Sequence, residues 1–204
     1  FHTAEWNHTV DLAGKRVGVI GTGSTAAQVI PEVAKAASKL SVFQRTPQWI
    51  FPWANKTVSE KSKKKLRDNP NRVRRLRGLY VWMMANLLTK ATAGHQPQRA
   101  LLSVTCQLNL KLSIKDKSLR KKLTPDYAVG CKRLVVNKTF YKAVQRNNVD
   151  LVTEGIAEIT PKGIKTRDGK EHELDALVLS TGFQNFNFMR PMDMRGKGGL
   201  KIDD

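Results

Sequence analysis

The chain has 204 residues, of which 40% are hydrophobic, enough to bury one sizeable core or two small ones. Its formal net charge of +19 suggests an anionic partner, but no nucleic-acid-binding motif accompanies it and no apolar run is long enough to span a membrane. The two cysteines and four scattered histidines match no metal-ligand spacing, so we expect no metal site. Sparse cysteines also favour a reducing, cytoplasmic location.

A glycine-rich turn lies near the N-terminus, within the stretch GVIGTGSTAAQV, residues 18–29. The apolar run at 17–20 predicts a buried strand before it, and apolar residues at helical spacing predict a helix after it. The turn fits the pattern G-x-G-x-x-A: Gly21 allows a tight turn, Gly23 lets a pyrophosphate approach the backbone, and Ala26 lets the helix pack closely. The helix start attracts the anion. We therefore predict a dinucleotide site; the alternative is a plain strand–turn–helix.

The next predicted strand, residues 40–43, narrows the choice of cofactor. An NAD-binding unit carries an acidic residue about 20 residues beyond the glycines, where it binds the ribose 2′-hydroxyl. Here the strand end carries Arg45 and no carboxylate. A guanidinium suits a 2′-phosphate, which favours NADP(H) over NAD(H). The alternative is that Arg45 is a solvated surface residue.

Residues 56–125 are predicted to be mainly helical and contain two basic groups. Both are interpreted as solvated helical faces that could steer an anionic cofactor. The apolar stretch 79–84 follows the first group and is too short to span a bilayer. It predicts a buried core helix, with binding to a membrane surface as the alternative. The first group is Lys56, Lys61, Lys63, Lys64, Lys65, Arg67, Arg72, Arg74, Arg75 and Arg77; the second is Lys111, Lys115, Lys117, Arg120, Lys121 and Lys122.

Strand signals return after residue 125. A near-continuous apolar strand ends at Thr181-Gly182, and the end of a buried strand is where α/β sheets place ligands. The predicted fold is α/β, a Rossmann-like doubly wound domain interrupted by a helical insertion. The predicted elements are a helix at 138–146 and strands at 149–153, 156–160, 163–166 and 174–180.

Several motifs resemble those of the flavin-containing Baeyer–Villiger monooxygenases, and they occur in that family's order over residues 2–199. The matching segments are the following: His2 to Trp6, similar to the end of F-x-G-x-x-x-H-x-x-x-W; Gly21 to Gln28, the NADP-binding turn; Val42 to Pro47, the strand end that holds the 2′-phosphate; Gly130 to Arg133, similar to G-x-K-R; Asn147 to Val152; Ser180 to Phe183, similar to A-T-G-F; and Arg195-Gly196.

The resemblance implies FAD and NADP(H) as cofactors and assigns roles to individual residues. Lys132 would assist with the phosphate, and Arg133 would reach the flavin as the catalytic residue, since a guanidinium keeps its proton while it stabilises an anion. His2 and Trp6 would couple domain motion to cofactor position; the alternative is a packed linker. The implied cofactor-binding residues are Gly21, Thr22, Gly23, Ser24, Thr25, Gln28, Arg45, Thr46, Lys132, Thr181 and Gly182.

The resemblance also implies a reaction: NADPH- and FAD-dependent insertion of one oxygen of dioxygen next to a ketone carbonyl, giving an ester or lactone. Trp6 favours this reaction over N- or S-oxygenation. The sequence is also compatible with a non-catalytic NADP-binding remnant and with a basic nucleic-acid- or membrane-binding protein. The expected partners are a ketone and dioxygen, without nucleic acid, and with weak membrane-surface association as an option.

The expected organisation has five parts: a linker at 1–12, the NADP-binding domain at 13–50 and 129–182, a helical insertion at 51–128, and a return towards an FAD domain at 183–204. The family's FAD-binding G-x-G-x-x-G unit has no counterpart in this sequence. We therefore expect the chain to be part of a longer protein and to be inactive alone.

Overall fold

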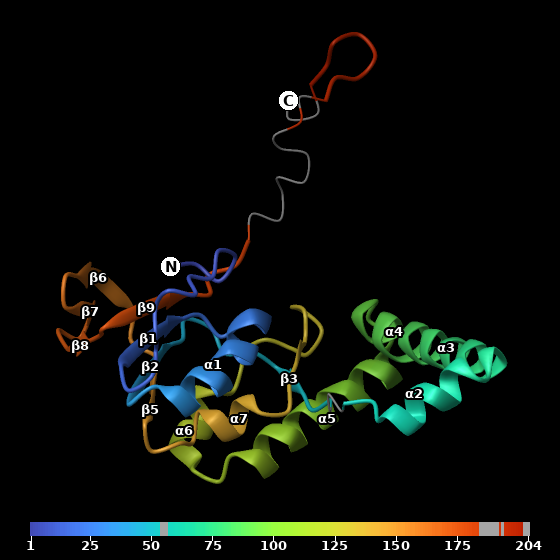
Figure 1. Ribbon diagram of the computed structural model, residues 1–204, viewed down its shortest axis with the longest axis horizontal. Coiled ribbons are helices and arrows are strands. Elements are labelled where there is room, and N and C mark those ends of the chain that lie inside the picture. Colours follow the sequence, from blue (N-terminus) through green and yellow to red (C-terminus); the bar gives the residue numbers. More distant parts are fainter. Residues whose placement is uncertain (54–56, 184–191, 193, 202–204) are drawn as a thin grey trace.

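The computed structural model describes residues 1–53, 57–183, 192 and 194–201. Its centre is a four-stranded sheet with the order β5–β2–β1–β9, in which all neighbours are parallel (Figure 1). The carboxyl ends of all four strands therefore lie at one edge, and the predicted α/β fold with a parallel sheet is confirmed. The strands are β1 (Arg16–Ile20), β2 (Lys39–Phe43), β5 (Val149–Val152) and β9 (Ala176–Leu179).

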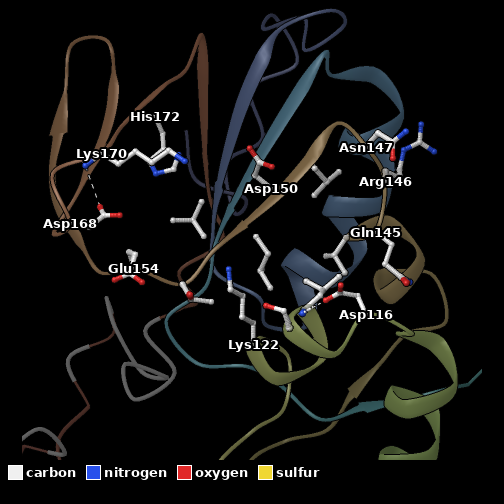
Figure 2. Close-up of a pocket in the computed structure, with 17 residues that line it drawn as sticks. Asp116, Lys122, Gln145, Arg146, Asn147, Asp150, Glu154, Asp168, Lys170 and His172 are labelled. Atoms are coloured by element: carbon white, nitrogen blue, oxygen red, sulfur yellow. Dashed lines mark hydrogen bonds between the residues drawn. The ribbon is translucent and has the colours of Figure 1, made fainter.

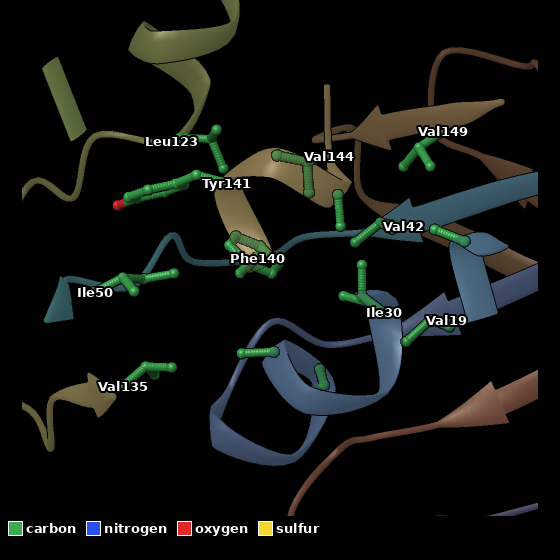
Figure 3. Packing of buried hydrophobic residues seen from close by; sticks show 14 of the residues in the cluster. Val19, Ile30, Val42, Ile50, Leu123, Val135, Phe140, Tyr141, Val144 and Val149 are labelled. Atoms are coloured by element: carbon green, nitrogen blue, oxygen red, sulfur yellow. The ribbon is translucent and has the colours of Figure 1, made fainter. Parts of the chain in front are cut away.

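One face of this sheet packs on helix α1 (Ser24–Ala36), and helix α7 (Phe140–Ala143) packs against α1. Alternate strand residues point to this face, so Val19 and Val42 meet Ile30 of α1 in a fully buried cluster (Figure 3). Apolar residues at helical spacing in α1 supply the matching surface, as the sequence predicts.

The other face packs on a three-stranded antiparallel sheet. Phe43 and Val152 of the parallel sheet cluster with Ile164, and the Phe43 ring lies edge-on to His172 with centroids 5.4 Å apart. The sequence predicts helices on both faces of a doubly wound sheet, whereas strands cover this face, with Ile164 as the buried contact to the parallel sheet. The strands are β6 (Ile156–Thr160), β7 (Gly163–Thr166) and β8 (Glu171–Glu173).

Some element boundaries differ from the sequence prediction. The apolar strand expected at 174–180 is β9, 176–179, and the expected helix at 138–146 forms only α7, 140–143. Two short strands, β3 (Ile50–Phe51) and β4 (Val135–Val136), pair in parallel and are missed by the sequence analysis. Two residues are too few to establish a periodic pattern.

Residues 57–122 are largely helical, as predicted. Helix α5 buries Leu102, Cys106 and Leu110 in the main core, whereas α2 and α3 bury none of their residues. The helices are α2 (Glu60–Arg67), α3 (Pro70–Met83), the π-helix η1 (Met84–Thr89), α4 (Lys90–Thr92), α5 (Gln96–Ser113) and α6 (Lys117–Lys122).

The expectation that residues 79–84 form a buried core helix is wrong. Leu79 is 61% exposed and Trp82 is 64% exposed. The reason is that α2 and α3 project from the core (Figure 1): α2 contacts α3, and α3 contacts η1, and neither helix has a buried residue in the part of the chain that the structure describes. No helix within the described ranges is long and apolar enough to cross a bilayer.

Arg16 ties the start of β1 to the chain around β8 and β9. Its guanidinium pairs with Glu173 and donates to Asp175 at 2.7 Å, and its backbone N–H donates to the same Asp175 carboxylate at 2.8 Å. These hydrogen bonds lower the pKa of Asp175 from 3.8 to about 2.

We predict that Asp175→Asn removes part of the acid sensitivity of folding. A carboxylate whose pKa is lowered by folding stabilises the fold above its unfolded pKa, and this contribution is lost as pH falls from about 4 to about 2. Urea midpoints measured across this range should fall more steeply for the parent chain than for Asp175→Asn. Arg16→Gln should flatten the profile similarly, and adding it to Asp175→Asn should change little more. An unchanged acid slope in Asp175→Asn would contradict the prediction.

Candidate functional site

The glycine turn follows β1 and is pressed against the end of β9. Gly21 has φ +109°, and a Cβ on it would lie 2.5 Å from the carbonyl oxygen of Ser180. Its N–H donates to Phe43 O at 3.0 Å, and Ser180 N–H donates to Ile20 O at 2.9 Å. Only glycine fits both the dihedral angle and the space at position 21, so the turn is held against both neighbouring strands.

The second glycine leaves its backbone accessible. Among the described residues, no atom lies within 4 Å of the position that a Cβ on Gly23 would occupy. Helix α1 begins at the next residue, without a side-chain cap and without an acidic residue in its first turn. Its first N–H groups and its dipole therefore form an accessible anion-binding end.

The other predicted residues of the turn support its shape. The Thr22 hydroxyl donates to Thr46 O at 3.1 Å, which joins the turn to the end of β2. The Gln28 amide donates back to Ser24 O at 3.1 Å. Ser24 is exposed and Thr25 is half-buried at the start of α1. The structure thus brings the predicted residues of 21–28 and Thr46 together.

A cavity of about 400 Å³ opens beside the end of β2. Arg45 lines it, as does Thr46, and three charged residues come from the segment containing α6: Lys121, Lys122 and Asp126. Three basic side chains against one acidic side chain make this cavity suitable for an anion such as a phosphate.

Gln44 fixes the end of α6 beside the end of β2. It is 4% exposed, its side-chain amide donates to Lys122 O at 2.7 Å, and its backbone N–H donates to Val152 O at 2.8 Å. The sequence analysis missed Lys121 and Lys122 as site residues because it treated their basic group as a solvated face. The hydrogen bond from Gln44 to Lys122 O brings the end of α6 next to Arg45. It joins residues far apart in the sequence, so no local sequence pattern predicts it.

Lys132 and Arg133 lie on a loop near the cavity but do not line it. The Lys132 ammonium sits 4.5 Å from the ring centroid of Tyr127. The Tyr127 hydroxyl donates to Pro47 O at 3.1 Å, so this loop is attached just beyond Thr46. Burial raises the pKa of Tyr127. Arg133 is exposed and makes no hydrogen bond or ion pair with the described residues.

The remaining predicted residues lie at the β9 side. Thr181 and Gly182 are exposed just after β9, and Gly182 has φ +100°. His2 forms a parallel bridge with Leu179 of β9 and lies edge-on to the Phe183 ring at 5.9 Å. Trp6 is half-buried and contacts the Phe1 ring at 5.0 Å. The linker motif is therefore packed along β9, at the side of the sheet that carries Thr181 and Gly182.

A larger cavity, of about 850 Å³, lies along β5 and shares Lys122 and Thr153 with the first cavity (Figure 2). Lys122 of α6 and His172 of the antiparallel sheet line opposite parts of it. Burial, with a contribution from nearby Lys170, lowers the pKa of His172. None of the glycine-turn residues lines this cavity, so its size alone does not make it the nucleotide site.

No protein-family model matches the chain. It is 44% identical to an uncharacterized monooxygenase of Mycobacterium tuberculosis, over 100% of this chain and 41% of that protein. It is 39% identical to a Baeyer–Villiger monooxygenase of Streptomyces coelicolor, over 90% of this chain and 35% of that protein.

Solved structures give the same result. The open crystal structure of cyclohexanone monooxygenase superposes with a TM-score of 0.81 and 28% identity, over 100% of this chain and 47% of that one. Oxidized steroid monooxygenase bound to NADP gives a TM-score of 0.82 and 29% identity, over 98% of this chain and 45% of that one. The chain spans less than half the length of these relatives. The match of sequence motifs, fold and relatives leads to one conclusion: this chain belongs to the flavin-containing Baeyer–Villiger monooxygenase family.

Proposed function

We propose that this chain forms a Rossmann-like NADP(H)-binding unit of an NADPH- and FAD-dependent Baeyer–Villiger monooxygenase. The observation that carries the proposal is the arrangement at the carboxyl edge of the sheet. There, the open backbone at Gly23 and the start of α1 lie next to β2, whose end carries Arg45 in a cavity rich in basic side chains. The backbone at Gly23 and the start of α1 suits a pyrophosphate, and the cavity lined by Arg45 suits a 2′-phosphate.

Each group then has a defined task in binding. The N–H groups at the start of α1 donate to the pyrophosphate, and the missing side chain at Gly23 lets it approach. Arg45 forms charge-assisted hydrogen bonds with the 2′-phosphate, and Thr46 adds a hydroxyl. Lys132 and the Thr181-Gly182 segment, which flank this edge, complete the proposed set.

FAD supplies the redox and oxygen-transfer chemistry when it is bound to the whole protein. Of the residues in this chain, we assign only Arg133 to that reaction centre. Its exposed guanidinium, without a partner among the described residues, is available to stabilise negative charge on a reacting oxygen next to a ketone. His2 and Trp6 along β9 are proposed to transmit motion to the cofactor. The domain boundaries given above remain proposals.

We predict that Arg45→Ala weakens NADP⁺ binding about ten- to hundredfold, because a charge-assisted hydrogen bond to the 2′-phosphate is lost. NAD⁺ has no 2′-phosphate, so its affinity should change little. Isothermal titration calorimetry of the 204-residue chain with NADP⁺, NAD⁺ and 2′,5′-ADP measures this difference. Arg74→Ala removes the same charge from exposed α3 and serves as the matched control. Equal binding of the two cofactors by the parent chain would refute the proposal.

We also predict that the double change Lys121→Ala and Lys122→Ala weakens NADP⁺ binding about three- to tenfold and reduces its dependence on salt. Exposed charges contribute less than a direct guanidinium–phosphate pair, which explains the smaller effect. The matched control is Lys64→Ala with Lys65→Ala, an adjacent exposed pair on α2. If both double variants lose the same affinity, the effect reflects overall charge and the assignment of the cavity fails.

The reaction itself is tested in the whole protein loaded with FAD. Arg133→Ala should lower ester or lactone formation from a ketone at least about a hundredfold, since a charge that stabilises the transition state is removed. NADP⁺ affinity should stay within about twofold. Arg74→Ala, which removes an exposed arginine from α3, controls for the loss of one guanidinium. Full product formation by Arg133→Ala would contradict its catalytic role.

A further inference from the structure

Helix α3 presents a stripe of apolar side chains to solvent. Val73, Leu76 and Tyr80 recur at helical spacing, with Leu79 beside them, and these four residues, here called the α3 stripe, are 45–61% exposed. Neither α2 nor α3 contains a buried residue. A contiguous apolar surface of this kind is typical of a site that another body covers.

Basic residues surround the α3 stripe. On an ideal helix, Arg75 and Arg77 fall on its two opposite borders. Residues 60–83 contain nine basic and two acidic residues, and one of the acidic residues, Glu60, is already paired with Lys63 at 2.7 Å. No arginine of α3 forms an ion pair with another residue in the described parts of the chain. The surface is therefore apolar along its centre and cationic along its edges.

Trp53 extends this surface beside Tyr80. It is 39% exposed, with its ring edge-on to that of Tyr80 at 6.2 Å. Trp82 is 64% exposed but falls beyond the Arg75 border on an ideal helix. Tryptophan and tyrosine combine an apolar body with a polar group, which favours the boundary between lipid chains and headgroups.

We propose that the α2–α3 surface docks on the headgroup region of a bilayer that contains anionic phospholipid. The α3 stripe would enter the boundary of the acyl chains while its bordering arginines meet lipid phosphates. Charge favours lipid over two other occupants: a second copy would set nine basic residues against nine, and a nucleic acid would leave the apolar stripe in water. The rest of a longer polypeptide is the third alternative occupant, and a whole FAD-loaded protein that does not bind anionic vesicles would assign the surface to it. Helix α3, at 14 residues, would lie in the plane of the interface.

Helix α5 provides a matched surface without the basic border. Leu101, Val104 and Leu108 are 48–55% exposed, but its 18 residues include only two basic ones, Arg99 and Lys111. The proposal predicts that α5 does not take part in docking, although its apolar exposure is similar.

The test is sedimentation of the 204-residue chain with vesicles of phosphatidylcholine, with and without about one third phosphatidylserine, at moderate salt. We expect binding only to the anionic vesicles, with a blue shift of tryptophan fluorescence that Trp53→Phe reduces. The triple change Leu76→Ser, Leu79→Ser and Tyr80→Ser, which leaves every charge in place, should weaken binding at least about tenfold. The triple change Leu101→Ser, Val104→Ser and Leu108→Ser on α5 should leave it unchanged.

Three results would overturn the proposal. Equal binding by the α3 triple variant would show that the charge of +19 alone attracts the vesicles. An equal loss in the α5 triple variant would show that any exposed apolar residue contributes. A parent chain that binds duplex DNA but not vesicles, or that is a dimer which the α3 changes dissociate, would assign the surface to a different occupant. Because these substitutions lie outside the nucleotide site, NADP⁺ titrations remain an independent readout of fold and cofactor binding.

Discussion

The contact between Gly21 and the Ser180 carbonyl is the constraint on which the site depends. This contact lets the turn that follows β1 pack directly against the end of β9. A Cβ at Gly21 would lie only 2.5 Å from the Ser180 carbonyl oxygen. The Gly21 N–H donates to Phe43 O at the end of β2, and the Gln44 N–H donates to Val152 O at the end of β5, so the turn is tied in sequence to both strand ends. Thr22 then joins the turn to Thr46, so the residues assigned to pyrophosphate and 2′-phosphate are held in one frame.

The basic residues of this chain occupy two different structural environments. At the end of α6, Lys121 and Lys122 line the cavity of Arg45, and the buried Gln44 holds that helix end in place. The uncharged side chain of Gln44 thus positions the charges of these two lysines. On α3, by contrast, the arginines border an exposed apolar stripe and have no ion pair within the described ranges. Net charge alone does not distinguish the lysines at the cavity from the arginines on α3, because it contains no information on where the charges lie.

Much of the fold follows from local patterns. The strand–turn–helix at 16–36 combines short-range periodicity with Gly21, whose dihedral angle and close contact with Ser180 require glycine, so sequence reasoning identifies both the elements and the turn. Sequence reasoning also identifies Arg45, because its position directly after β2 follows from its spacing from the glycine turn. The cover of the second sheet face and the two-residue strands β3 and β4 were not predicted, since they depend on pairing between distant segments.

The error at residues 79–84 has a different origin. Apolar content predicts burial only where other elements supply enough partner surface, and the contacts of α3 among the described residues leave none of its residues buried. Helix α5 separates this exposed surface from the cofactor cavity: η1 and α4 contact α5, and α6 follows its C-terminal end (Figure 1). Its 18 residues span about 27 Å. The α3 stripe and the cavity beside Arg45 therefore lie toward opposite ends of α5 and share no residue, so a body that contacts the stripe alone meets none of the residues that line the cavity.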